Sequence, residues 1–258
     1  MADSVLFDGS DDTLTASKGD WAGTGAFSIA VCLKSTGTLG TEVFLSHDSS
    51  AHDFYHETDG TIWWFISSGN YTTSSNAIVA DRWSIVGITY SGSGTTFRFH
   101  IYDETQGWLH ENGAATGSPA PWSSLTNVLF GEVGSTGNFD YSGNILIAGF
   151  ADSQFSDGTM ETLSDGYAAW IAASFDEGLR FTATTGLSTF TGGSMAQNGG
   201  AGKTVDTGDV PSWWDDTLFS LVEVDPDADT TTTGWTTTPL FSKINDDSDS
   251  TFITATLA

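Results

Sequence analysis

Apolar and polar residues alternate along two stretches in the first half of the chain. In residues 27–34 large apolar side chains share one face and smaller or polar side chains share the other, and residues 96–102 repeat the pattern. A period of two is typical of a half-buried β-strand. It places Cys32 opposite the main apolar stripe, where we expect it to be packed rather than reactive. The residues expected to lie between two sheets are Phe27, Ile29, Val31, Leu33, Phe97, Phe99 and Ile101.

Further strands follow from shorter apolar runs. Residues 61–67 and 84–90 are apolar on both faces, which predicts strands that are covered on both sides. Helical periodicity is confined to residues 158–175, where we expect one or two short helices. The connections are rich in residues that favour turns, and the pattern as a whole predicts an all-β, antiparallel, two-sheet sandwich. The remaining predicted strands span residues 5–8, 42–47, 127–133 and 144–151.

The composition changes near residue 176. Long apolar strands give way to Gly- and Thr-rich sequence over 177–224, and then to an acidic arm over 225–258. We therefore expect a sandwich domain over 1–176, a connecting segment, and an arm that docks on a partner subunit, with residues 251–257 adding a strand to a neighbouring sheet. The spaced apolar residues expected to anchor the arm are Trp235, Leu240, Phe241, Ile244, Phe252 and Ile253.

Charge and the N-terminal sequence limit the classes of partner. The chain has 33 acidic and 7 basic side chains, a formal net charge of −26, which repels nucleic acid and anionic membrane surfaces. No stretch approaches the roughly 20 apolar residues of a membrane-spanning helix, and the N-terminus lacks the pattern of a signal peptide. We expect synthesis in the cytoplasm of a host cell, no membrane insertion and no nucleic-acid partner.

The segment GGAGKT, residues 199–204, resembles the end of a phosphate-binding P-loop. That motif needs a glycine where this chain has Gln197, and a helix directly after the lysine. The following residues include Gly208 and Pro211, which leave no room for a helix. We interpret the segment as a surface turn.

Other polar constellations lack the context that catalysis or zinc binding requires. Glu223, Asp225 and Asp227 resemble the carboxylate series of some glycosidases, but Pro226 interrupts the strand that such a series needs. His47, His52 and His56 lie in a stretch interpreted as a loop, where the spacing does not align imidazoles. The sequence therefore predicts no catalytic residues.

The acidic turn DGSDD, residues 8–12, offers oxygen ligands that suit calcium. A solvated acidic turn without an ion is the alternative. The candidate ligands are Asp8, Asp11 and Asp12, and Ca²⁺ is the one cofactor that the sequence suggests.

The order of the segments resembles the concanavalin A-like, laminin G-like jelly-roll family. The segments VLFDGSDDTLTAS, GAFSIAVCLKS, TEVFLSH and GTIWWFIS lead to the most similar part, Asp81-Arg82-Trp83 followed by the strand SIVGITY and a glycine turn. The resemblance covers about residues 5–170 and implies a jelly-roll sandwich, here with a C-terminal extension. Members of the family include lectins, glycosidases and virion proteins. Residues 199–216 and 229–255 also resemble connecting sequences in minor tail and surface proteins of tailed viruses.

The resemblance implies that exposed aromatic side chains on the concave face of the fold can bind glycans. Trp63 and Trp64 are adjacent, so they point to opposite faces of one strand. Core packing or loop anchoring is the alternative for each aromatic candidate. The candidates are Trp63, Trp64, Tyr71, Trp108 and Trp122.

From the resemblance we expect a non-enzymatic surface protein of a tailed-virus virion, in the capsid or the tail. Its expected partners are other virion subunits, further copies of itself and a host-surface glycan. The alternatives are a free carbohydrate-binding lectin and a glycoside hydrolase. The hydrolase requires a carboxylate constellation that the chain lacks.

Overall fold

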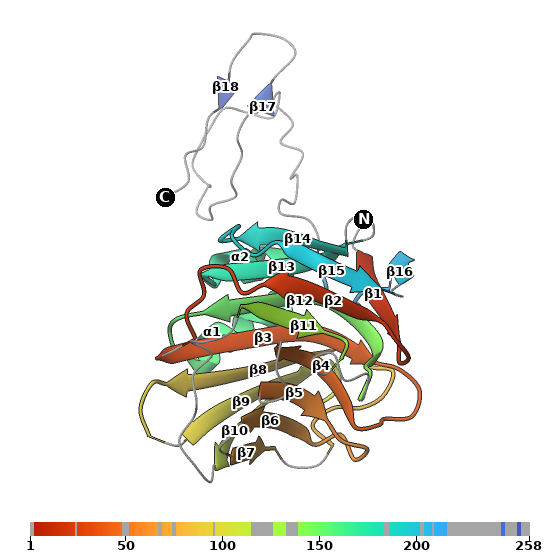
Figure 1. Ribbon diagram of the computed structural model, residues 1–258. Coiled ribbons are helices and arrows are strands. Elements are labelled where there is room, and N and C mark those ends of the chain that lie inside the picture. The colour runs from red at the N-terminus through yellow and green to blue at the C-terminus, as the bar shows by residue number, and fades with distance from the viewer. Residues whose placement is uncertain are drawn as a thin grey trace. The chain divides into compact units, whose positions relative to one another are not determined.

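The computed structural model describes most of the chain up to residue 215 and two short strands beyond it (Figure 1). The chain divides into a large unit, Met1–Asp216, and a small one, Thr217–Ala258. The described residues are 3–23, 25–47, 52–66, 69–73, 76–94, 96–114, 126–132, 139–182, 186–201, 204–207, 209–215, 244–245 and 252–253.

The large unit is a sandwich of two antiparallel sheets, which confirms the predicted fold class (Figure 1). Sheet A has the order β10-β9-β8-β3-β12-β1-β16, and β13 and β14 extend it beside β12. Its strands are β1 (Asp3–Asp8), β3 (Ala26–Ser35), β8 (Ser84–Ser91), β9 (Thr96–Asp103), β10 (Gly107–Ala114), β12 (Ser142–Ala151), β13 (Glu177–Thr182), β14 (Gly186–Thr191) and β16 (Thr204–Thr207).

Sheet B lies in front of sheet A in Figure 1 and has the order β15-β2-β11-β4-β5-β6-β7. Its strands are β2 (Thr13–Ser17), β4 (Glu42–His47), β5 (His52–His56), β6 (Ile62–Ile66), β7 (Gly69–Thr72), β11 (Asn127–Phe130) and β15 (Gln197–Ala201).

One hydrophobic cluster fills the space between the sheets. All seven residues predicted to lie there belong to it and are at most 3% exposed, so that prediction is confirmed. Sheet B contributes alternate residues such as Phe54, Ile62 and Trp64 to the same cluster. Their neighbours Tyr55, Trp63 and Phe65 therefore lie on the outer face of sheet B.

A second cluster covers the outer face of sheet A. It joins Ala30, Cys32 and Ile85 of the sheet to Met160 and to further residues of the helical segment. Strand β3 is thus buried on both faces, and the prediction that it is half-buried is wrong. Cys32 is packed, as expected, and burial raises the pKa of its thiol.

The segment predicted to be helical forms α1 (Asp157–Thr162), a short 3₁₀ turn η2 (Leu163–Asp165) and α2 (Tyr167–Ala172). The Ser156 side chain caps α1 by accepting a hydrogen bond from the Thr159 backbone N–H at 3.1 Å. Gly87 of strand β8 makes room for the helix, because a Cβ there would lie 2.2 Å from Met160 Cε. The helices bury the face of sheet A that the alternation of apolar and polar residues predicts to be exposed to solvent.

The predicted boundary near residue 176 does not coincide with the end of the sandwich. Strand β13 pairs with β12, β15 pairs with β2, and β16 pairs with β1. Backbone hydrogen bonds to neighbouring strands hold these strands in the sheets. Because such bonds do not require apolar side chains, the Gly- and Thr-rich sequence shows no clear alternation that would predict a strand. The described strands β13, β14, β15 and β16 are thus part of the two sheets and not of a connecting segment.

Two further predictions are corrected in the described residues. The stretch interpreted as a loop around His52 and His56 contains strand β5, which pairs with β4 and β6. Strand β6 is not covered on both sides, since Trp63 and Phe65 are half-exposed.

In GGAGKT, Gly199–Ala201 end strand β15 and Thr204 begins strand β16. A strand therefore follows where a P-loop needs a helix.

In the small unit the structure describes only the antiparallel pair β17 (Ile244–Asn245) and β18 (Phe252–Ile253). The predicted anchors Ile244, Phe252 and Ile253 belong to this pair. Trp235, Leu240 and Phe241 lie outside the described residues, as do the boundary at 224 and the glycosidase-like residues Glu223, Asp225 and Asp227. Within the described part of the chain, no helix has the length and apolar character needed to span a membrane.

Candidate functional site

Three aromatic side chains lie on the outer face of sheet B, and we call them the outer aromatic cluster: Tyr55, Trp63 and Phe65. Tyr55 and Trp63 are direct cross-strand partners in β5 and β6. Their rings are nearly parallel, with centroids 6.0 Å and planes 10° apart. All three residues are half-exposed. Strand pairing therefore fixes a stacked aromatic pair on the outer face that solvent reaches in part.

The structure separates the aromatic candidates that the sequence suggested. Trp63 belongs to the outer aromatic cluster, whereas Trp64 is 1% exposed in the core between the sheets. Trp108 lies in strand β10 of sheet A, where its indole N–H donates to Ser164 Oγ at 3.3 Å. Tyr71 is the strand partner of Trp64 in β7, and its side chain is outside the described residues, as is Trp122.

Tyr55 was missed because its strand was interpreted as a loop. The sequence did hold a signal, since Phe54 and Tyr55 are two adjacent aromatic side chains, a residue type that is enriched in strands. The pairing of Tyr55 with Trp63 depends on the register of β5 with β6, which local sequence does not specify.

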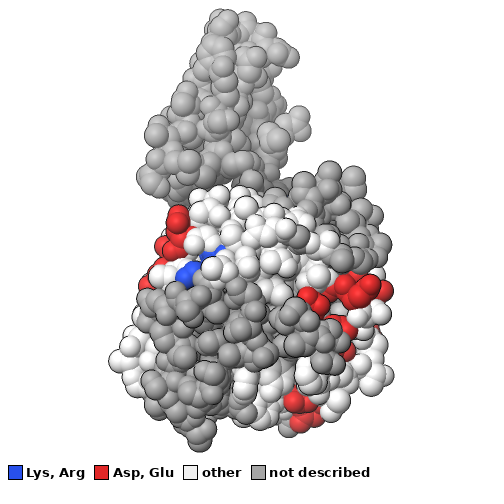
Figure 2. Space-filling view, viewed as in Figure 1, with Lys and Arg blue, Asp and Glu red and all other residues white. Residues whose placement is uncertain are grey.

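Acidic side chains gather toward the left and right sides of the molecule in the view of Figure 2. The predicted calcium turn brings three carboxylates together, since ligand oxygens of Asp8, Asp11 and Asp12 lie within 4.8 Å of one another. The carboxylates also accept hydrogen bonds within the turn, from Ser10 N to Asp8 at 2.9 Å and from Asp8 N to Asp12 at 2.5 Å. Burial, and then Asp11 and Asp8, raise the pKa of nearby Asp140. Negative charge is therefore concentrated in this turn. Calcium binding there stays a prediction.

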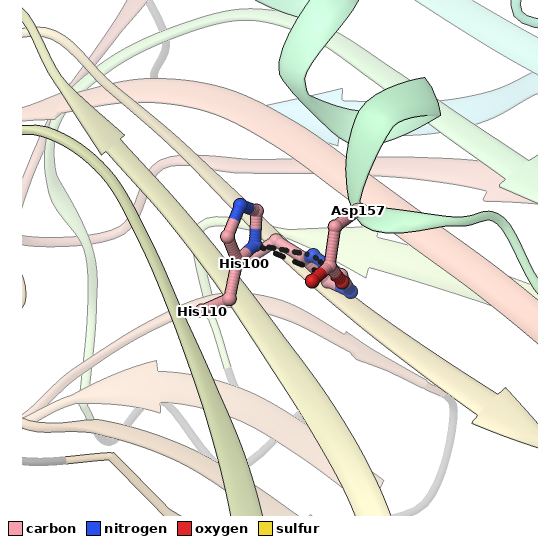
Figure 3. A group of neighbouring side chains, drawn as sticks. All are labelled: His100, His110 and Asp157. Atoms are coloured by element: carbon pink, nitrogen blue, oxygen red, sulfur yellow. Dashed lines mark hydrogen bonds and ion pairs between the residues drawn. The ribbon is translucent and has the colours of Figure 1, made fainter.

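A second polar group lies on the outer face of sheet A, and sequence reasoning missed it (Figure 3). His100 of β9 and His110 of β10 are cross-strand partners whose Nδ1 atoms are 2.9 Å apart. The carboxylate of Asp157, at the start of α1, lies 3.7 Å from His100 Nδ1 and 4.0 Å from His110 Nδ1. We call these three residues the histidine–aspartate cluster.

The surroundings of the cluster fix the orientation of each side chain. His100 Nε2 lies 3.0 Å from Thr89 Oγ1, and His110 Nε2 lies 3.0 Å from Glu161 Oε1. Arg98 binds both carboxylate oxygens of Asp157, with Nε 2.6 Å from Oδ1. Its guanidinium holds the pKa of the Asp157 carboxyl below the usual value.

Burial, and then the neighbouring His110, lower the pKa of His100 to about 3. The ring is therefore neutral at pH 7. A carboxylate can only accept hydrogen bonds, so His110 Nε2 donates to Glu161.

No known family model matches the sequence, and no curated protein matches it. Among solved structures, the chain is similar to a "putative carbohydrate binding protein" from Bacteroides ovatus, with a TM-score of 0.57 and 13% sequence identity. The match covers 82% of this chain and 61% of that one, so the chain spans about three fifths of that protein's length.

Two further similarities have TM-scores below 0.5. The CBM40 of the Ruminococcus gnavus IT-sialidase, bound to α2,6-sialyllactose, has a TM-score of 0.44 and 12% identity, over 60% of this chain and 93% of that one. A leech intramolecular trans-sialidase has a TM-score of 0.40 and 16% identity, over 61% and 27%. The similarity to the Bacteroides ovatus protein shows the fold that the two chains share, a β-sandwich.

Proposed function

We propose that this protein is a non-enzymatic carbohydrate-binding module whose ligand binds on the outer face of sheet B. The observation that carries the proposal is the nearly parallel, half-exposed pair of Tyr55 and Trp63. The flat faces of aromatic rings pack against the C–H faces of sugar rings. Rings held by two paired strands lose little conformational entropy on binding, which favours affinity. The shared fold with a protein described as carbohydrate-binding supports the proposal.

The charge of the chain favours a neutral glycan over an anionic one. The formal net charge of −26 sets up a negative potential around the protein. That potential slows the approach of sialylated or sulfated glycans and weakens their binding. We therefore propose a neutral oligosaccharide as the ligand class.

A glycan array followed by calorimetry tests the proposal. We expect the full chain to bind at least one neutral oligosaccharide, and Trp63→Ala to lower the affinity by about tenfold or more, since a few aromatic anchors carry most of the binding energy. The matched control is Trp108→Ala, which removes a half-buried tryptophan from sheet A and should leave binding unchanged. Absence of glycan binding, or equal affinity of Trp63→Ala and the unsubstituted chain, would overturn the proposal.

The virion-surface location, the other virion subunits as partners, and the homo-oligomer stay predictions. None of the solved structures named above is described as viral. Catalysis is tested directly by incubating the protein with the polysaccharides that it binds. Hydrolysis would favour the glycosidase alternative.

A further inference from the structure

The histidine–aspartate cluster brings together ligands from three separate elements. Two are opposite each other in the β9–β10 hairpin, and the third is the first residue of α1. His100 is buried, the His110 side chain is 14% exposed and the Asp157 side chain is 39% exposed. The cluster is thus anchored in the protein on one side and open to solvent on the other.

The distances between the potential ligand atoms suit a tetrahedral metal ion. Zinc bound at about 2.0–2.1 Å by nitrogen and oxygen requires its ligand atoms to lie about 3.3–3.4 Å apart. The three observed separations are 2.9 Å between the two Nδ1 atoms, and 3.7 Å and 4.0 Å from these to Asp157 Oδ1. Shifts of a few tenths of an ångström in side-chain position bring all three atoms to the required spacing.

The groups around the cluster are the kind that orient metal ligands. A ligating imidazole usually donates its other N–H to a carboxylate or another oxygen. His110 Nε2 faces Glu161 Oε1 and His100 Nε2 faces Thr89 Oγ1, each at 3.0 Å. Arg98 fixes Asp157 by a two-oxygen interaction. Each ligand candidate therefore already has the partner that would hold it in place.

We propose that His100 Nδ1, His110 Nδ1 and Asp157 Oδ1 bind one zinc ion, with the fourth position open to solvent. Two imidazoles and one carboxylate favour zinc over calcium or magnesium, which prefer oxygen ligands. Binding requires His100 to carry its proton on Nε2, where it is donated to Thr89 Oγ1, so that its Nδ1 lone pair is free for the metal ion. The positive charge of Arg98 opposes the metal ion and the negative charge of Glu161 favours it.

Titration of the full chain with Zn²⁺ by calorimetry, and with Co²⁺ by visible absorption, tests the site. We expect one high-affinity equivalent, Co²⁺ bands of tetrahedral intensity that Zn²⁺ abolishes and Ca²⁺ does not, and a rise in melting temperature on adding Zn²⁺. His110→Ala and Asp157→Asn should each weaken Zn²⁺ binding by tenfold or more. Glu161→Gln, which alters a positioning residue only, should weaken it by about tenfold.

Two controls distinguish the site from non-specific binding by an acidic protein. Asp8→Asn removes a carboxylate from the acidic turn and should leave the Zn²⁺ affinity and the Co²⁺ spectrum unchanged. Circular dichroism of His110→Ala, whose side chain is partly exposed, checks that the variant is folded. If a folded His110→Ala binds Zn²⁺ as tightly as the unsubstituted chain, or if Co²⁺ gives only the weak spectrum of its octahedral aquo ion, the inference is wrong.

Discussion

Trp63 and Trp64 are adjacent in strand β6 and lie on opposite faces of sheet B. Trp64 is 1% exposed and packs edge-on against Phe54, with ring centroids 5.3 Å apart. Trp63 is half-exposed and lies beside Tyr55 on the outer face. Because the side chains of a strand alternate, one dipeptide contributes both to the core and to the proposed glycan surface.

Substitution of the two tryptophans should therefore give opposite results. Trp64→Ala leaves a cavity between the sheets and should lower the free energy of unfolding by about 3–5 kcal/mol. Trp63→Ala should lower it by about 1 kcal/mol or less, because the ring is only partly buried. Urea denaturation followed by circular dichroism measures both. Equal losses for the two variants would contradict the assignment of faces.

A buried carboxylate should be essential for stability. Glu177 is 1% exposed and accepts hydrogen bonds from the backbone N–H groups of Asp20 at 3.2 Å, Ser194 at 3.3 Å and Met195 at 3.4 Å. Glu177→Ala leaves these donors without their acceptor and should cost about 3 kcal/mol or more. Thermal and urea unfolding measure the loss. Glu104→Ala, at an exposed position, is the matched control and should cost less than about 0.5 kcal/mol.

The stability should fall in mildly acidic solution because His56 is buried in its neutral form. Its Nε2 lies 2.9 Å from Ser35 Oγ, and burial lowers its pKa to about 4. At pH 7 its 3.5 Å contact with Glu42 is thus not an ion pair. Because the folded-state pKa lies below the unfolded value of about 6.5, the unfolded chain binds the proton first as the pH falls. The contribution of His56 to the free energy of unfolding is therefore fully present above pH 6.5 and is lost as the pH falls toward 4, by about 3 kcal/mol in total.

His56→Gln isolates this contribution. His100 also has a lowered pKa and adds a loss of the same sign, whereas burial raises the pKa of Glu42, which opposes the loss near pH 5. We expect the difference in unfolding free energy between the unsubstituted chain and His56→Gln to shrink between pH 6.5 and pH 4.5. A difference that is constant over this range would show that His56 does not titrate differently on unfolding.

Much of the sandwich could be predicted because its central strands carry their own pattern. The strand predicted at 42–47 is observed as Glu42–His47, and the apolar residues of β3 and β9 are in the core. The covering of sheet A by helices was not predicted. The second face of β3 holds Ser28, Ala30 and Cys32, which are small side chains that suit close packing of a helix, but alternation alone cannot distinguish a small buried residue from a solvated one.

The candidate sites could be predicted only in part because they depend on register and tertiary contact. Trp63 was identified from its position beside Trp64, whereas Tyr55 required the pairing of β5 with β6. The proximity of His100 and His110 follows from the β9–β10 hairpin once its register is known. Asp157 joins them only because α1 packs on sheet A, and no local pattern encodes that contact.

Two truncations should locate the end of the folded unit more precisely than the sequence could. Residues 209–215 follow the last strand of sheet A and contact the sheet. Asp209 forms an ion pair with Lys34, and its backbone oxygen accepts a hydrogen bond from Ser4 Oγ at 2.8 Å. Trp214 is 8% exposed and belongs to the second cluster. A chain that ends at residue 216 keeps these contacts. Its free energy of unfolding should lie within about 1 kcal/mol of that of the full chain.

A chain that ends at residue 208 loses both contacts. It should be less stable by about 3–5 kcal/mol, since removing Trp214 empties a buried site in the second cluster and Lys34 loses its carboxylate partner. The two truncations differ by only eight residues, so a difference in unfolding free energy between them reports on the segment from 209 to 216 alone. If both truncated chains were equally stable, residues 209–215 would contribute nothing to the sandwich. If the chain ending at 216 were unfolded, the sandwich would depend on residues 217–258.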